Sequence, residues 1–178
     1  MRAGHIRFEG ARPAGSVHTT VQGRAHQSRI TVIDGDGVLP RHLNKHIDYR
    51  QRVAPPAVRE KSLALPTGMA ISDDGRTLYL ATFGSAKVGV FDTRELETDR
   101  FVPDRASQIE LLAGGPSGLV LDEARGRLYV LTRFNNAVAV VDIASRKQIA
   151  SHAMPNPEPA SVVAGRRFLY DARYTSSN

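Results

Sequence analysis

The sequence predicts an all-β fold, a partial β-propeller made of antiparallel four-stranded blades, two of them nearly complete and two partial. A segment of 28 residues recurs 50 positions further along the chain without a gap. Each copy consists of short β-prone runs separated by turn residues, and the middle runs are apolar at consecutive positions. Propellers repeat one four-stranded sheet about every 40–50 residues and bury both faces of each sheet against its neighbours.

The repeat has two long copies and two short ones. PTGMAISDDGRTLYLATFGSAKVGVFDT begins at Pro66, and PSGLVLDEARGRLYVLTRFNNAVAVVDI begins at Pro116. A short match, RITVID, precedes the two long copies. It ends at Asp34, which corresponds to Asp142 near the end of AVAVVDI in the second long copy. Another short match, PASVVAGRRFLYDAR, follows from Pro159 and repeats the Leu-Tyr step at 169–170.

Each long copy predicts three strands in the same order. A Pro-x-Gly turn precedes the first strand, a polar turn containing Gly leads to the second, and another tight turn leads to the third, which is rich in β-branched residues. The expected strands are 69–71, 78–82 and 88–91 in the first copy, 119–121, 128–132 and 138–141 in the second, and 168–170 in the short last copy.

The ends of the third strands and the outer strands complete the blades. Asp92 and Asp142 end the third strands, where a carboxylate can accept a backbone N–H. KQIASHA at 147–153 predicts an outer fourth strand, and the matching region of the first copy, through SQIELL at 107–112, is more irregular.

The number of blades leaves the predicted propeller open. Closed propellers contain about 4–8 blades, so two blades and two partial ones are too few for a ring. A parallel β-helix would need shorter rungs, and a stand-alone sandwich would not explain a gapless repeat. We therefore expect a piece of a larger ring, or self-association through open blade edges, because uncovered edges and apolar faces seek partners.

Composition narrows the function classes. The apolar fraction of 41% and the charged fraction of 24% are those of a globular protein, and no apolar run is long enough for a transmembrane helix. The net charge is +6, but the basic residues are scattered among acidic ones, so we predict no nucleic-acid partner. The absence of cysteine excludes disulfides and covalently attached haem within these residues. No signal peptide is visible at residues 1–15.

Two short patterns suggest metal ions, and neither leads us to predict a metal site. His42 and His46 would share one face of a helix, but the helical context is poor and only Asp48 lies nearby as a third ligand. The DGDG run from Asp34 to Gly37 lacks the further oxygen ligands of a calcium loop, so we interpret it as turns between strands.

No catalytic residue is predicted either. The serines lack the context of a nucleophile elbow, Glu158 lies between two prolines as a turn residue, and His152 lies near the end of an outer strand. The loop AGGPSG at 113–118 and the tip at 133–135 lie where propellers present their central face, and we interpret the tip as a plain hairpin, with ligand contact as the alternative. The tip residues are Arg133, Phe134 and Asn135, and the serines are Ser72, Ser117 and Ser161.

The repeat resembles the YVTN-type β-propellers of bacterial and archaeal surface and periplasmic proteins. The residues that carry the resemblance are RTLYLATFGSAKVGVFDT and GRLYVLTRFNNAVAVVDI, in which the name-giving motif appears as YLAT and YVLT. The match is to the pattern of the motif rather than to its letters, and it covers roughly residues 30 to 170. The resemblance implies a location in the periplasm or cell envelope.

The last stretch, GRRFLYDARYTSSN, resembles the lead-in to the haem domain of dihaem cytochrome c peroxidases. This resemblance implies haem c for the intact protein and none in this chain, a cytochrome c-like domain or redox protein as partner, and a haem-proximal place for Asp171 and Arg173. Together with the repeat, this resemblance predicts a poorly structured segment at 1–29, blades at 30–164 and, at 165–178, the start of a linker into a cytochrome c-like domain. The expected function is a non-catalytic scaffold for electron transfer, and the alternative is a propeller enzyme with lactonase-like or haem peroxidase-like activity. The matching residues are Gly165, Phe168, Leu169, Asp171, Arg173, Ser176 and Ser177.

Overall fold

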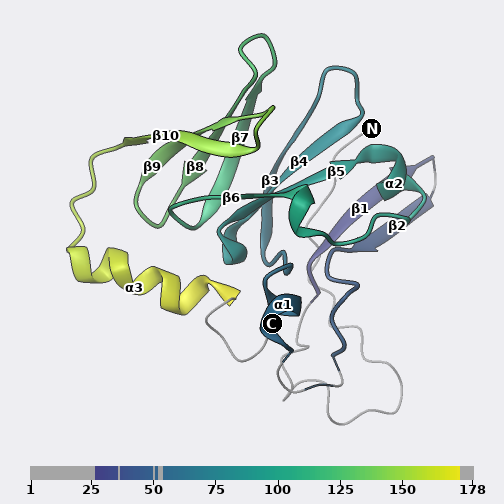
Figure 1. Cartoon of the computed structure of the whole chain (residues 1–178), viewed down its shortest axis with the longest axis horizontal. Coiled ribbons are helices and arrows are strands. Elements are labelled where there is room, and N and C mark those ends of the chain that lie inside the picture. Colours follow the sequence, from purple (N-terminus) through teal and green to yellow (C-terminus); the bar gives the residue numbers. More distant parts are fainter. Residues whose placement is uncertain (1–26, 36, 50, 52–53, 173–178) are drawn as a thin grey trace.

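The computed structural model describes residues 27–35, 37–49, 51 and 54–172. Three antiparallel sheets follow one another along the chain and stand side by side (Figure 1). The first is a hairpin of β1 (Arg29–Asp34) and β2 (Gly37–His42). The first blade contains β3 (Pro66–Ile71), β4 (Thr77–Thr82), β5 (Lys87–Asp92) and β6 (Gln108–Glu110), and the second contains β7 (Pro116–Asp122), β8 (Arg127–Thr132), β9 (Ala137–Asp142) and β10 (Lys147–Ala153).

Both blades are four-stranded meanders, which confirms the predicted partial propeller and its strands between residues 66 and 153. The register repeats as well as the sequence. Thr77 lies opposite Asp92 in the first blade, and 50 residues later Arg127 lies opposite Asp142. The hydroxyl of Thr82 donates to the carbonyl of Lys87 at 2.8 Å, and Thr132 makes the equivalent bond at 3.0 Å. The two copies are therefore one structural unit used twice.

The predicted roles of the two aspartates that end the third strands are also confirmed. Asp92 is the N-cap of α2 (Thr93–Glu97), where its carboxylate accepts the N–H of Arg94 at 2.8 Å. Asp142 accepts the N–H of Ser145 at 2.8 Å in the turn before β10. This bond is the main reason why the pKa of Asp142 lies below its ordinary value.

Close packing of the first strands of the two blades depends on Gly68. A Cβ atom at this position would lie 2.9 Å from the carbonyl oxygen of Ser117, so a side chain would push β3 and β7 apart. The hydroxyl of Thr67 donates to the carbonyl of Pro116 at 3.0 Å across the same gap. The Pro-x-Gly pattern thus serves the contact between blades as well as the start of each strand.

The first blade is buried on both faces. One face contributes Leu78, Leu80 and Phe91 to an apolar cluster shared with Ile30 and Val32 of β1. The opposite face packs on the second blade in another cluster, whose buried members are Tyr79, Val88, Val90, Ile109, Leu111, Leu128, Val130, Ala139 and Val141. Continuous apolar strands follow from this arrangement, since β4 and β5 have no solvent-facing side.

The N-terminal hairpin confirms that RITVID forms a strand and that a turn follows it. β1 pairs with β2 from Arg29 opposite His42 to Asp34 opposite Gly37. Gly35 has a positive φ of 54°, which suits glycine in so tight a turn. Asp36 and residues 1–26 lie outside the described residues, so the predicted character of the N-terminal segment stays a prediction.

The strand expected at 168–170 is wrong, because these residues end the helix α3 (Ala160–Tyr170). Pro159 precedes the helix, where its fixed φ favours a helical start, and Ala, Arg and Leu within it are good helix formers. A second strand of a blade also needs a neighbour on each side, and the Leu-Tyr step alone does not provide them. The third copy of the repeat is therefore absent from the described residues, and the division of the chain into domains stays a prediction.

Short helical segments connect the strands. They are α1 (Pro56–Arg59) before the first blade, η1 (Phe83–Ser85) at the tip between β4 and β5, α2 after β5, and η2 (Arg105–Ser107) before β6. None of the helices in the described ranges has the length and hydropathy needed to cross a lipid bilayer.

Candidate functional site

The hairpin tips of both blades are built in the same way, and each is tied to the loop that precedes its blade. The N–H of Phe83 donates to the carbonyl of Leu65 at 2.9 Å. In the second blade the N–H of Arg133 donates to the carbonyl of Gly115, also at 2.9 Å. We call this end of the two blades, the tips at 83–86 and 133–136 with the loops at 64–65 and 113–115, the rim.

An aromatic cluster fixes α3 on the rim. The rings of Phe83 and Phe134 meet edge to face with centroids 5.2 Å apart, and Tyr170 at the end of α3 lies 5.6 Å from Phe83 and 6.1 Å from Phe134. Edge-to-face pairs stabilise by about 0.5–1.5 kcal/mol beyond the burial of area. The cluster therefore attaches the C-terminal end of α3 to the tips of both blades.

Hydrogen bonds attach the same helix through Arg166. Its guanidinium donates to the carbonyls of Arg133 and Phe134, both at 3.1 Å, and it pairs with the carboxylate of Glu158. Glu158 thus precedes the helix and holds its arginine, which is a structural role in addition to the predicted turn. A single arginine joins the helix, the segment before it and the tip of the second blade.

Two glycines of the AGGPSG loop make room for Phe134. A Cβ atom on Gly115 would lie 2.5 Å from Cδ1 of the Phe134 ring, and one on Gly114 would lie still closer to it. Phe134 is 5% exposed, so the ring fills the concave side of this loop. The sequence carries no signal for this contact, because Gly115 and Phe134 are 19 positions apart and belong to different segments.

A hollow of about 590 Å³ opens on one side of α3. Its walls combine the rings of Phe83 and Tyr170 with the polar groups of Arg133, Asn136 and Asn156. A second hollow of about 400 Å³ lies on the other side of the helix, where Asn135, Arg167 and Asp171 are among the lining residues. The predicted tip residues therefore line both hollows, and contact of this tip with a ligand or partner stays a prediction.

The structure places one of the two predicted haem-proximal residues at this rim. Asp171 follows α3, is 1% exposed, and its N–H donates to the carbonyl of Arg167 at 3.1 Å. Arg173 lies outside the described residues. A haem-proximal role of either residue stays a proposal, as does the presence of haem c in the intact protein.

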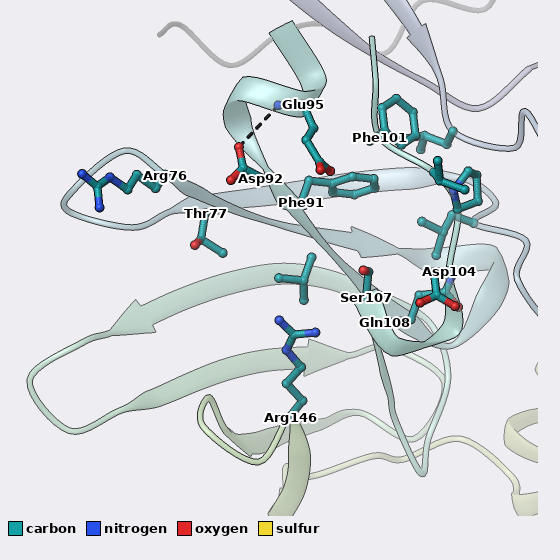
Figure 2. A pocket seen from close by; sticks show the side chains of 15 residues that line it. Arg76, Thr77, Phe91, Asp92, Glu95, Phe101, Asp104, Ser107, Gln108 and Arg146 are labelled. Atoms are coloured by element: carbon teal, nitrogen blue, oxygen red, sulfur yellow. Dashed lines mark hydrogen bonds between the residues drawn. The ribbon is translucent and has the colours of Figure 1, made fainter. Parts of the chain in front are cut away.

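A third pocket, of about 300 Å³, lies away from the rim between the first blade and the connection from α2 to β6. Figure 2 shows Phe91 and Asp92 of β5 with Glu95 of α2 along one wall, Phe101 beyond them, and Arg76 and Arg146 at separate edges of the pocket. The carboxylate of Asp92 is engaged in capping α2. The pocket is not predictable from the sequence, because the irregular stretch between β5 and β6 forms part of its walls and distant segments form the rest.

The two histidines considered as metal ligands make contacts with the protein. Nε2 of His46 lies 2.9 Å from the carbonyl of Val58, and Nδ1 of His42 accepts the N–H of Asn44 at 2.9 Å. Burial is the main cause that lowers the pKa of His46 below its ordinary value. In the part of the chain that the structure describes, no three His, Cys, Asp or Glu side chains come close enough to hold a metal ion.

The serines and the remaining histidine are not brought together. Ser72 lies in the turn after β3, where its hydroxyl donates to Asp74 at 2.6 Å. Ser117 is in β7, Ser161 is exposed on α3, and His152 is exposed on β10. Their positions on separate elements offer no pairing of a nucleophile with a base among these four residues.

Comparisons with known proteins give likenesses of structure only. No protein-family model matches the sequence, and no curated protein matches it. Hydrazine synthase of Kuenenia stuttgartiensis is 22% identical over 51% of this chain and 23% of its own, with a TM-score of 0.42. The gluconolactonase XC5397 of Xanthomonas campestris is 25% identical over 74% of this chain and 36% of its own, with a TM-score of 0.44. The β-propeller domain of Cps50 (Swd1) of Myceliophteria thermophila is 16% identical over 67% and 33%, with a TM-score of 0.43. The chain thus covers between about a quarter and just over a third of the length of these chains.

Proposed function

We propose that this chain is a non-catalytic β-propeller module that holds and orients a c-type cytochrome domain or redox protein at its rim. The observation that carries the proposal is the attachment of α3. Phe83, Phe134 and Tyr170 fix the end of this helix, and Arg166 fixes its middle. Whatever contacts α3 is thereby oriented relative to both blades.

The outer side of α3 has the character of a binding surface. Phe168 is 65% exposed, Leu169 is 71% exposed and Val162 is 49% exposed, although all three belong to one helix of eleven residues. Exposed apolar side chains that gather on one element mark surfaces for protein partners. The same stretch carries the resemblance to the lead-in of a haem domain, which supports a c-type cytochrome as the partner.

Charge narrows the choice of partner. The chain carries a net charge of +6, and Arg133, Arg166 and Arg167 lie at the rim around α3. Complementary charge steers the encounter of two proteins and raises the association rate at low salt. We therefore expect an acidic redox partner. The resemblance of the repeat to YVTN-type propellers supports a location in the periplasm or cell envelope.

The test is a titration of the chain with an acidic monohaem cytochrome c in sedimentation velocity, in which the Soret absorbance of the cytochrome monitors how it sediments. The cytochrome should sediment with the chain at low salt, and the double variant Phe168→Asp, Leu169→Asp should weaken the complex about tenfold or more. Val102→Asp is the matched control, since Val102 is 76% exposed but lies in the connection between α2 and β6. Equal binding by wild type and double variant would contradict the role of α3. Hydrolysis of a lactone or oxidation by peroxide, with the chain alone as catalyst, would favour the enzyme alternative.

A further inference from the structure

The three sheets are stacked in one direction, and each sheet presents the same two faces in the same order. β1 directs Ile30 and Val32 at the first blade, and the first blade directs Tyr79, Val88 and Val90 at the second. By the 50-residue step, the matching residues of the second blade are Tyr129, Val138 and Val140. They lie on the face of the second blade that points away from the first, and in Figure 1 no other sheet stands on that side.

This outer face is less covered than its counterpart. Tyr79 and Val88 of the first blade are 6% and 0% exposed, whereas Tyr129 and Val138 are only partly buried. Val120 of β7, which lies opposite Tyr129 in the same sheet, is 64% exposed. The second blade therefore carries the pattern of a blade-to-blade contact, and the described residues include no further sheet that would complete it; we call this surface the tail face.

The other end of the stack has the complementary pattern. Ile33 and Val38 lie opposite each other in the hairpin, on the face that points away from the first blade, and they are 48% and 64% exposed. When RITVID is aligned with the third strand of the second copy so that Asp34 matches Asp142, Ile33 matches Val141. Val141 is buried in the cluster between the two blades. The hairpin thus carries, on its outer side, the pattern that the second blade uses to cover the first, and we call this surface the head face.

We propose that the tail face of one copy of this chain binds the head face of another copy, so that the contact repeats the packing between the two blades within the chain. The contact is heterologous, because different surfaces of the two copies meet, and it leaves one free head and one free tail in a dimer. Further copies then extend the stack or close it into a ring. This inference does not depend on the redox partner proposed above, since it concerns the two sheet faces and not the rim.

Two exposed valines allow each face to be blocked separately. Val120→Lys places a charge in the tail face and Val38→Lys places one in the head face, and both positions are exposed enough for the chain to fold unchanged. Val102→Lys is the matched control, with a valine that is 76% exposed outside both faces. Far-ultraviolet circular dichroism and thermal unfolding of each variant check the fold.

Sedimentation equilibrium of the full chain over a range of concentrations measures the association. Wild type and Val102→Lys should associate, and Val120→Lys and Val38→Lys should each weaken the association about tenfold or more. An equimolar mixture of the two blocked variants should form a dimer and nothing larger, because the intact tail of one meets the intact head of the other. A wild-type chain that stays monomeric at high concentration overturns the proposal. Association that only Val120→Lys prevents indicates two tails in contact, and it overturns the proposal as well.

Discussion

Replacing Gly115 with alanine should destabilise the protein more than any other single added methyl group in its turns. Gly115 has a φ of +71°, and its Cβ atom would lie 2.5 Å from the buried ring of Phe134. The left-handed conformation costs a residue with a Cβ about 1–2 kcal/mol. An overpacked methyl group in a filled site costs about 1–3 kcal/mol more, so we expect a loss of about 2–5 kcal/mol in the free energy of unfolding.

Two further glycines separate these causes. Gly126 has a φ of +61° with no atom within 4 Å of its Cβ position, so Gly126→Ala carries only the conformational cost. Gly114 lies against the same Phe134 ring without a positive φ, so Gly114→Ala carries only the overlap. Urea unfolding followed by circular dichroism gives the three free-energy changes, and Phe134→Leu in the background of Gly114→Ala should recover part of the loss.

The reasoning fails if Gly115→Ala costs no more than Gly126→Ala. Such a result would mean that the Phe134 ring moves aside freely, and then the aromatic cluster would not fix α3 on the rim. Failure of Phe134→Leu to improve Gly114→Ala would lead to the same conclusion by an independent route.

Three other changes test separate parts of the structure. Burial lowers the pKa of His46, so the unfolded chain binds the proton more tightly than the folded chain, and the stability of the protein should fall as the pH decreases below about 6.5. Thermal unfolding at several pH values measures this dependence. It should become smaller in His46→Gln but not in the exposed control His152→Gln. Lys87→Met should lower the free energy of unfolding in urea by about 1–3 kcal/mol, because the buried amine donates to Gln108 Oε1 at 2.9 Å and the variant leaves that oxygen without this donor. Lys147→Met, at an exposed site, should change the free energy of unfolding little. Equal losses in the two variants would contradict the role of the buried amine. Asp92→Ala should cost about 1 kcal/mol through the loss of the α2 cap, whereas Asp92→Asn should keep most of the stability; an equal loss in both variants would exclude capping as the cause.

Much of the fold was predictable because each blade is coded by local signals. Turn residues such as Gly75 and Gly126 separate the strands, and β-branched runs mark the third strands. The repeat supports each predicted strand and turn with two copies of the same pattern. The last copy misled for the same reason, since its Leu-Tyr step at 169–170 belongs to a helix rather than to a strand.

The candidate site was predictable only in outline. The tip of the second blade and the AGGPSG loop were recognised as parts of the central face, but the contact of Phe134 with Phe83 and Tyr170 joins segments that lie far apart in the sequence. The hydrophobic periodicity of the sequence does not predict contacts between segments that lie this far apart. The same holds for the pocket of Figure 2, which the irregular connection between β5 and β6 encloses.

The sequence by itself determined the number of strands in each blade, their order and the positions of their turns, because hydrophobic runs and turn residues act over a few neighbours. Only the tertiary structure decided which side chains those strands bury. Lys87 shows the difference: the second copy has Ala137 in its place, and a lysine there suggests a solvent-facing position, yet it is 1% exposed with Gln108 and the carbonyl of Glu60 as its partners. Glu60 comes from the connection before the first blade and Gln108 from the outer strand β6, and only folding brings both to the amine.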